Sequence, residues 1–293
     1  MSALANVRLA SQPVHNEENV QVGTVLGPQI AILDTWPGQA TYGPGEAAAI
    51  YVSLVNRGNH AMRVRIAAEL RWLDERLLTT DQDVDLAVGS ATAALPLALP
   101  DTGFRGYGID VSVLDATGAL LASDTTALDV LLDWTEAPRY GFLSDFSPGD
   151  PLAATNVQAL ARYHINVVQF YDWMWRHYVL MPPTAEYTDG MGRLLSIHTV
   201  RAKVSACEAA GMAAMSYAAV YGAEPEYALK HPDEMLYDGS GKPYSIENLF
   251  YVMNIHKGNS WRRQILAEMA RAVRDVPFDG LHLDQYGFRK SDA

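Results

Sequence analysis

The sequence is poor in cysteine and in basic residues. Only one of its 293 residues is a cysteine, Cys207, so no disulfide can form within the chain and no thiolate metal cage can be built. Lysine and arginine together number 22 against 34 acidic residues, which gives a formal net charge of −12. Nucleic acids and anionic lipids are bound through clustered Lys and Arg. This balance therefore argues against either as the main partner, while neutral ligands such as sugars remain compatible.

Several localisation and catalytic signals are missing as well. The N-terminus, MSALANVRLASQPVHNEENV, has no basic start followed by an apolar run, so it does not read as a signal peptide. No stretch approaches the length of a membrane span. There is no Gly-x-Ser-x-Gly elbow, phosphate loop or His-Glu-x-x-His stretch, and the eight histidines show no metal spacing. We therefore expect neither a metal nor another cofactor.

The first part of the chain has the pattern of an all-β domain. Short apolar runs such as MRVRIAAELRWL alternate with turn signals, and a hairpin is expected at residues 116–118. This spacing predicts an antiparallel β-sandwich over residues 25–136, after an N-terminal extension at 1–24. Because the chain lacks a Cys…Trp…Cys core, the sandwich is at most immunoglobulin-like.

From Trp134 onward the pattern changes to alternating strands and helices. The strand-like runs are YGFLSDF, INVVQFYDW, MAAMSYAAVYG and FDGLHLDQYG, and amphipathic helical stretches separate them. Apolar strands joined by crossover helices predict a parallel sheet that is covered on both faces.

Two architectures fit four such units in residues 137–293. A closed (β/α)8 barrel needs about 250 residues, so this would be the first half of one, ending after its fourth strand. A complete open doubly wound α/β sheet is the alternative. The long loops after the second and third strands, 174–193 and 222–257, favour the barrel, because barrel enzymes contact their substrates through such loops.

The fourth strand carries the strongest catalytic candidate. Strand periodicity puts His282 and Asp284 on one face and Leu281 and Leu283 on the other. In a barrel the leucines would face the helices and Asp284 would stand at the carboxyl-terminal rim. A carboxylate there is costly unless it is hydrogen-bonded or used. An aspartate that caps the next helix fits this strand equally well.

The second strand shifts the balance toward function. QFYDWMWRH brings aromatic and ionisable groups into one strand end, where rings can stack on sugars while polar groups bond hydroxyls. A core corner with solvent-facing charges is the competing interpretation. Tyr217 and Tyr221 end the third strand and add aromatic surface at the same rim, although by themselves they are better explained as core residues. Asp145 closes the first strand and is ambiguous by itself.

These four runs, in this order, resemble glycoside hydrolase family 66, the dextranases and cycloisomaltooligosaccharide glucanotransferases. The resemblance implies an immunoglobulin-like domain ahead of a (β/α)8 barrel, an α-1,6-glucan or isomaltooligosaccharide substrate, and a retaining mechanism. It also implies that Asp284 is the nucleophile and that Tyr171, Asp172 and Trp173 lie in a glucose-binding motif. The substrate-binding candidates are Asp145, Tyr171, Asp172, Trp173, Trp175, His177, Tyr217, Tyr221, His282, Gln285 and Tyr286.

The family's proton donor is a glutamate on a later barrel strand, and Glu224, Glu226 and Glu247 match no such role. We therefore expect the chain to be the N-terminal portion of a longer enzyme. By itself it should be inactive and prone to self-association through open barrel edges. The compartment stays open, because the family is commonly secreted. The rival hypotheses are a non-catalytic carbohydrate-binding protein with an open sheet and an α/β hydrolase acting on another substrate.

Overall fold

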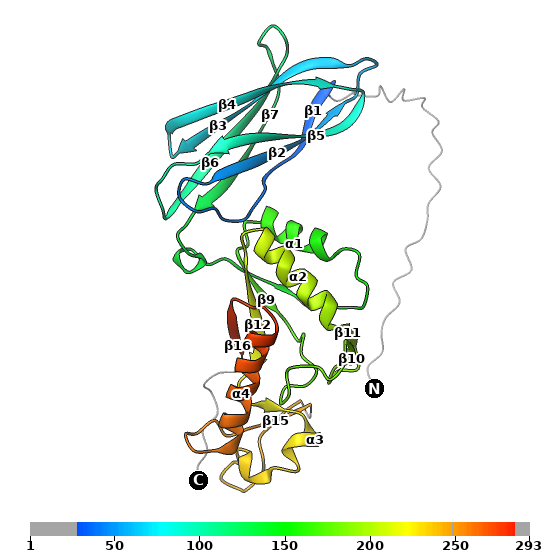
Figure 1. The fold of residues 1–293 in the computed structure, drawn as a ribbon, viewed down its shortest axis with the longest axis vertical. Helices are drawn as coiled ribbons and strands as arrows, with labels where there is room; N and C mark the ends of the chain where they lie inside the picture. The colour runs from blue at the N-terminus through cyan, green and yellow to red at the C-terminus, as the bar shows by residue number, and fades with distance from the viewer. Residues whose placement is uncertain (1–27, 248, 285–293) are drawn as a thin grey trace, which may run out of the picture.

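The computed structural model describes residues 28–247 and 249–284 (Figure 1). Its first part consists of seven antiparallel strands in two sheets, of order β1-β2-β5 and β4-β3-β6-β7. The strands are β1 (Ile30–Pro37), β2 (Ala47–Asn56), β3 (Met62–Trp72), β4 (Glu75–Leu86), β5 (Gly89–Ala98), β6 (Arg105–Leu114) and β7 (Leu120–Val130).

One apolar core is built from these two sheets. Alternate residues of each strand point inward, as in β2, where Ile50, Val52 and Leu54 are buried. The expected hairpin joins β6 to β7, and Asp115 stabilises its turn by accepting hydrogen bonds from the backbone N–H groups of Thr117 and Ala119. The alternation of apolar residues thus predicted this part well.

The second part mixes helices with short strands. Its elements are η1 (Trp134–Glu136), β8 (Tyr140–Leu143), α1 (Ala153–Arg162), β9 (Val167–Phe170), β10 (Glu186–Thr188), β11 (Leu194–Ser196), α2 (Ile197–Ala209), β12 (Ala213–Ala219), β13 (Gly222–Ala223), α3 (Pro225–Ala228), η2 (Pro232–Glu234), β14 (Ser245–Ile246), β15 (Phe250–Val252), α4 (Ser260–Asp275) and β16 (Gly280–Asp284). A four-stranded parallel sheet, β16-β12-β9-β8, is its centre. The small sheets β10-β11 and β13-β15-β14 lie in the loops after β9 and β12.

The parallel strands follow one another in chain order. Each of β8, β9, β12 and β16 pairs with the next along the sequence, whereas a doubly wound sheet reverses its strand order at a switch point. The expectation that both faces are covered is wrong for β8, because Tyr140 is 58% and Phe142 is 63% exposed. Leu281 and Leu283 of β16 were expected to pack on helices, but they too are exposed.

Close contacts join the sandwich to the α/β part. The segment after β1 runs beside the end of α2, where the backbone N–H of Ala40 donates to the carbonyl of Ala210 at 2.8 Å. The Thr41 hydroxyl donates to the carbonyl of Gly211 at 2.6 Å. Gly211 has a left-handed φ of 64°, and a Cβ there would lie 2.6 Å from the backbone carbonyl oxygen of Thr41. Only glycine satisfies both conditions, so this residue fixes the approach of the two parts.

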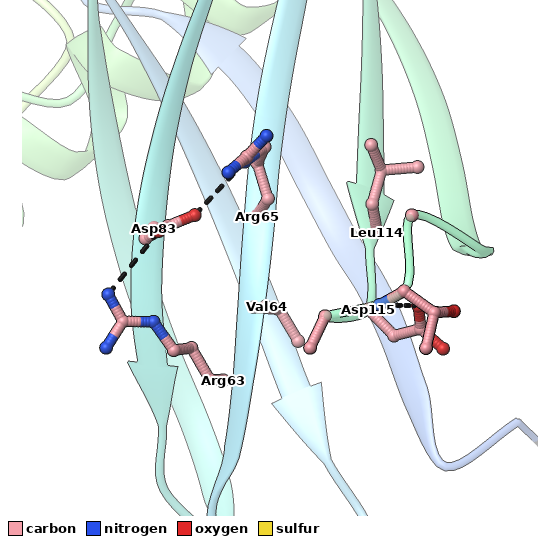
Figure 2. Close-up of a pocket in the computed structure, with 9 residues that line it drawn as sticks. Arg63, Val64, Arg65, Asp83, Leu114 and Asp115 are labelled. Carbon is pink, nitrogen blue, oxygen red and sulfur yellow. Dashed lines mark hydrogen bonds and ion pairs between the residues drawn. The ribbon is translucent and has the colours of Figure 1, made fainter.

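A hollow of about 400 Å³ lies on the sandwich at β3 (Figure 2). Arg63 and Arg65 both reach Asp83 there, at 3.4 and 3.1 Å, and their side chains are exposed. Exposed pairs of this kind contribute little to stability. The hollow holds none of the residues that the sequence marked for catalysis.

Candidate active site

A cavity of about 310 Å³ lies at the carboxyl ends of β9, β12 and β16, the edge where parallel sheets place their ligands. The loops that follow β9 and β12 form its walls. The lining residues are Tyr171, Asp172, His177, Met191, Tyr217, Ala219, Gly222, Ile246, Glu247, Leu249, Phe250 and Asp284.

Asp284 and Tyr217 form the floor of this cavity. They stand on neighbouring strands, and the Tyr217 hydroxyl donates a hydrogen bond of 2.9 Å to Oδ2 of Asp284. Burial, together with the Asp284 carboxylate, raises the pKa of Tyr217 far above its usual range. The phenol therefore keeps its proton and can only donate to the carboxylate. Among residues 28–247 and 249–284, none donates a hydrogen bond to the second carboxylate oxygen of Asp284.

Aromatic rings surround this pair. The rings of Tyr171 and Tyr217 lie 4.8 Å apart, and Phe142 meets Tyr171 edge-on at 6.4 Å. His282 stacks on Tyr217 at 6.5 Å, although it is not among the cavity-lining residues. Tyr171 is 38% exposed. Its ring is therefore available to a ligand, and the apolar face of a sugar is the kind of group that such a ring contacts.

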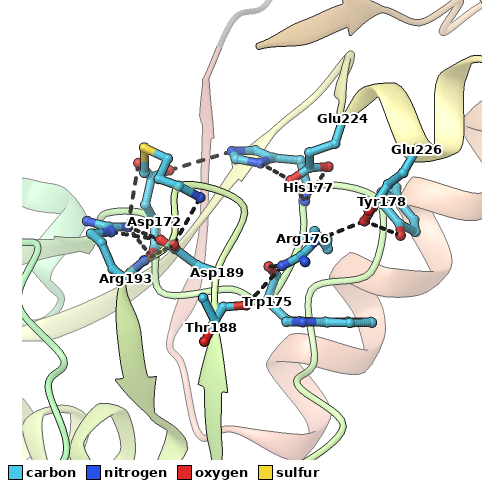
Figure 3. A network of polar contacts seen from close by, with 11 residues as sticks. Asp172, Trp175, Arg176, His177, Tyr178, Thr188, Asp189, Arg193, Glu224 and Glu226 are labelled. Carbon is cyan, nitrogen blue, oxygen red and sulfur yellow. Dashed lines mark hydrogen bonds and ion pairs between the residues drawn. The ribbon is translucent and has the colours of Figure 1, made fainter.

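A network of charged side chains that includes Asp172, His177 and Glu224 connects the loops after β9 and β12 (Figure 3). The ring of His177 lies between two carboxylates, with Nδ1 3.0 Å from Glu224 and Nε2 3.6 Å from Asp172. Burial alone would lower the pKa of His177, but hydrogen bonds and charge from Asp172 and Glu224 outweigh it and raise the pKa to about 9. The imidazole is therefore a cation at neutral pH. Arg193 contributes a second cation, paired with Asp189 at 2.7 Å and donating to the carbonyl of Asp172 at 2.9 Å.

Five sequence candidates come together at this cavity: Tyr171, Asp172, His177, Tyr217 and Asp284. Trp173 does not fit a sugar-stacking role, because it is fully buried and its indole N–H donates to Ser216. The ring of Trp175 lies under the guanidinium of Arg176 instead of in the cavity. Tyr221 is buried and does not line the cavity either.

Asp145 has a local structural role. Its Oδ1 accepts hydrogen bonds from the N–H and hydroxyl of Ser147, and these bonds lower the pKa of the carboxyl. The carboxylate is thereby used in a turn after β8 and does not line the cavity. Gln285 and Tyr286, two further candidates, lie outside the described residues.

Several residues of the long loops contribute to the cavity although sequence patterns did not point to them. Glu224 is the buried partner of His177, Arg193 supports Asp172, and Ile246 and Phe250 form an apolar wall. Glu247 lines the cavity with an exposed carboxylate. No short motif marks them, because each acts on a partner that is distant in sequence.

Comparison with known proteins shows the family of this chain. The family model described as "Glycosyl hydrolase family 66" matches residues 37–293. The chain belongs to this family. The resemblance inferred from the strand motifs is thereby confirmed.

Relatives of family 66 are considerably longer than this chain. A cycloisomaltooligosaccharide glucanotransferase of Niallia circulans is 30% identical over 270 residues, which cover 86% of this chain and 27% of the relative. A second one from the same organism is 28% identical over 86% of this chain and 28% of its own length. The crystal structure of a Paenibacillus sp. cycloisomaltooligosaccharide glucanotransferase with cycloisomaltoheptaose superposes with a TM-score of 0.80 at 27% identity, covering 89% of this chain and 39% of that one. The chain thus spans well under half the length of these relatives.

Within residues 28–247 and 249–284, no cluster of His, Cys, Asp and Glu side chains is arranged to hold a metal ion. In the same described part, none of the helices is both long and apolar enough to cross a membrane.

Proposed function

We propose that this chain carries the nucleophile side of the active site of a retaining glycoside hydrolase that acts on α-1,6-linked glucan. The observation that carries the proposal is the position of Asp284, which is hydrogen-bonded by Tyr217 at the floor of a cavity with an aromatic wall. Membership of family 66 and the similarity to glucanotransferases support the substrate class. Endo-hydrolysis and transglycosylation share this first step and differ only in the acceptor.

Asp284 would attack the anomeric carbon in the first half of the reaction. A bond forms between a carboxylate oxygen and that carbon, and the glycosidic bond breaks as its oxygen takes a proton from a general acid. Water or a sugar hydroxyl then displaces Asp284, giving its proton to the same acid–base residue. Tyr217 would orient the attacking carboxylate throughout.

The proton donor must be a second carboxyl group about 5–5.5 Å from the nucleophile. Hydrogen bonds from Tyr178 and Arg176 lower the pKa of Glu226, so it stays ionised and cannot donate. The carboxylate of Glu224 is already engaged by the backbone N–H and the ring of His177. We propose that the donor lies outside the described residues. Glu247 is an exposed glutamate that lines the cavity, and the variant Glu247→Gln tests whether it is the donor instead.

The overall architecture belongs to the same proposal. Residues 25–136 would be an immunoglobulin-like sandwich, and 137–293 the first half of a (β/α)8 barrel. The unreversed order β8, β9, β12, β16 supports a barrel over a doubly wound sheet.

An activated donor tests the nucleophile without requiring a general acid. With α-isomaltosyl fluoride, Asp284 bonds to the anomeric carbon while fluoride leaves with the bonding electrons, and no proton is required. Mass spectrometry of the digested chain should find an isomaltosyl ester on the peptide containing Asp284. Asp284→Asn should abolish it, and Asp238→Asn, in an exposed turn, should not. Labelling at another residue, or equal labelling of Asp284→Asn, would contradict the proposal.

A non-catalytic carbohydrate-binding protein is the second candidate function. The exposed rings of Phe142 and Tyr171 favour it, because they offer a stacking surface without requiring any chemistry. The same experiment separates the two candidates. Isomaltotriose binding without any ester formation would favour the binding protein.

A further inference from the structure

Two loops meet at a single buried side chain beside the cavity. His177 belongs to the loop after β9, and its backbone N–H donates to both carboxylate oxygens of Glu224 at 3.0 and 3.1 Å. Its ring adds a third contact to Glu224 and approaches Asp172 at the end of β9. All three side chains are less than a tenth exposed. Isolated charges at this depth would be costly, so the two carboxylates depend on the cation between them.

Glu224 extends this contact to two further segments. It is the N-cap residue of α3, and its carbonyl accepts hydrogen bonds from Tyr227 and Ala228. Its Oε1 also lies only 2.8 Å from the position that a Cβ on Gly190 would take. Gly190 is in the turn between β10 and β11, and its φ is outside the left-handed region. The backbone conformation of Gly190 does not require a glycine. The missing side chain instead leaves room for the close approach of Glu224.

The same group of residues determines where the cavity walls stand. The His177 ring meets Phe250 edge-on at 4.5 Å and Tyr217 edge-on at 6.4 Å. Asp172 has a left-handed φ of 51°, a costly conformation that persists only where its surroundings hold it. Arg193, which donates to the Asp172 carbonyl, and His177 hold it from opposite sides.

We propose that His177, clamped between Asp172 and Glu224, is a positioning residue that fixes the loops after β9 and β12 as the walls of the substrate cavity. Its role is to set affinity for the α-1,6-glucan unit, not to take part in bond making. The inference rests on the proposed function, because it assigns the cavity to that substrate.

Three variants weaken the contacts of His177 with Asp172 and Glu224, which together form the clamp. His177→Gln removes the cation, Glu224→Gln removes one anion, and Gly190→Ala pushes Glu224 away without altering any residue that lines the cavity. The matched controls are His198→Gln, at an exposed histidine, and Gly108→Ala, where the added Cβ meets open space. Circular dichroism verifies that each variant is folded.

The first measurement is the rate of Asp284 labelling against α-isomaltosyl fluoride concentration. Loss of a charged hydrogen bond should raise the half-saturating concentration about tenfold in each clamp variant. The maximal rate should stay within about threefold, because the reacting atoms are untouched. Neither control should change either quantity.

The second measurement is the pH dependence of that half-saturating concentration. The charged and titratable groups facing His177 are Asp172 and Glu224, with Arg193 and Asp189 behind Asp172 and Tyr217 at the ring edge. Deprotonation of His177 should weaken affinity reversibly as the pH rises through about 9. The variant His177→Gln should not show this loss of affinity as the pH rises. An NMR titration should show that the His177 imidazole is still protonated at neutral pH and loses its proton only near pH 9.

The outcomes separate the inference from the proposed function. Normal labelling of Asp284 with unchanged saturation in all three variants would overturn the positioning role and leave the nucleophile assignment standing. An ordinary titration of His177 would overturn it as well. If Asp284 is not labelled in the unmodified chain, the proposed function fails. The affinity for isomaltotriose then tests the positioning role of His177. About tenfold weaker binding in the three variants supports this role, and unchanged binding refutes it.

Discussion

The hydroxyl of Tyr217 lies 2.9 Å from Oδ2 of Asp284, on the next strand of the parallel sheet. The register places Tyr217 opposite His282 and Ala219 opposite Asp284, so the phenol reaches forward by two positions to meet the carboxylate. Because burial raises the pKa of Tyr217, its hydroxyl keeps its proton. In this contact the phenol is therefore the donor and the Asp284 carboxylate the acceptor. The pair thus fixes one carboxylate oxygen, Oδ2, while Oδ1 accepts no hydrogen bond from any described residue.

Tyr217→Phe should slow the labelling of Asp284 by α-isomaltosyl fluoride about 10- to 100-fold. A hydrogen bond to a charged group contributes about 1.5–3 kcal/mol, and its loss frees the carboxylate to rotate. Isomaltotriose affinity should change little, because the ring remains. Tyr237→Phe, which removes a hydroxyl bonded to the Pro232 carbonyl outside the cavity, is the matched control. An unchanged labelling rate in Tyr217→Phe would show that the contact is dispensable.

Strand periodicity pointed to Asp284, but not to the residues around it. The alternation along β16 separates Asp284 from the leucines of the same strand, whereas the sequence by itself favours a core position for Tyr217. Trp173 was misjudged because β9 ends at Phe170 and the left-handed turn at Asp172 sends the next side chain into the core. Glu224 could not be found because its partner His177 is 47 residues away. Such pairs are set by tertiary packing of the loops, which no local pattern encodes.

Lys203 should be a strong contributor to stability. It is fully buried on α2, and its Nζ lies 2.8 Å from Asp150 and 2.5 Å from the carbonyl of Asp145. Lys203→Met should lower the free energy of unfolding by about 3 kcal/mol, because it strands the Asp150 carboxylate. Urea denaturation monitored by tryptophan fluorescence measures this. Lys242→Met, at an exposed lysine, is the control and should be nearly neutral.

A second substitution tests the reason for that loss. Adding Asp150→Asn to Lys203→Met should recover part of the stability, because the unpaired charge is removed. The Lys203 hydrogen bond lowers the pKa of Asp150, so its contribution is present at neutral pH and is lost as the pH falls. Lys203→Met should therefore weaken the dependence of stability on acid. A double variant that is no more stable than the single one would attribute the loss to packing alone.

The stability of the α/β part should fall at alkaline pH. The pKa of His177 is raised from 6.5 to about 9, so protonation of the folded state contributes stability that is fully present below about pH 6.5 and is lost as the pH rises through 9. The loss is on the order of 3 kcal/mol. Chemical denaturation at a series of pH values measures it. His177→Gln should flatten this slope, whereas His198→Gln should preserve it. An identical slope in His177→Gln would assign the alkaline loss to other groups.

The edges of the parallel sheet should drive self-association of the chain. In the described part, β8 and β16 are the outer strands, and Phe142 and Leu283 expose apolar surface on them. Unpaired edges beside exposed apolar side chains are sites of strand pairing between molecules. Sedimentation velocity should therefore show dimers or larger species whose fraction grows with concentration. Leu283→Glu should shift the distribution toward monomer through charge repulsion, while Leu120→Glu, at a still more exposed leucine of the sandwich, should not. A monomer at all concentrations would mean that these edges are protected in solution.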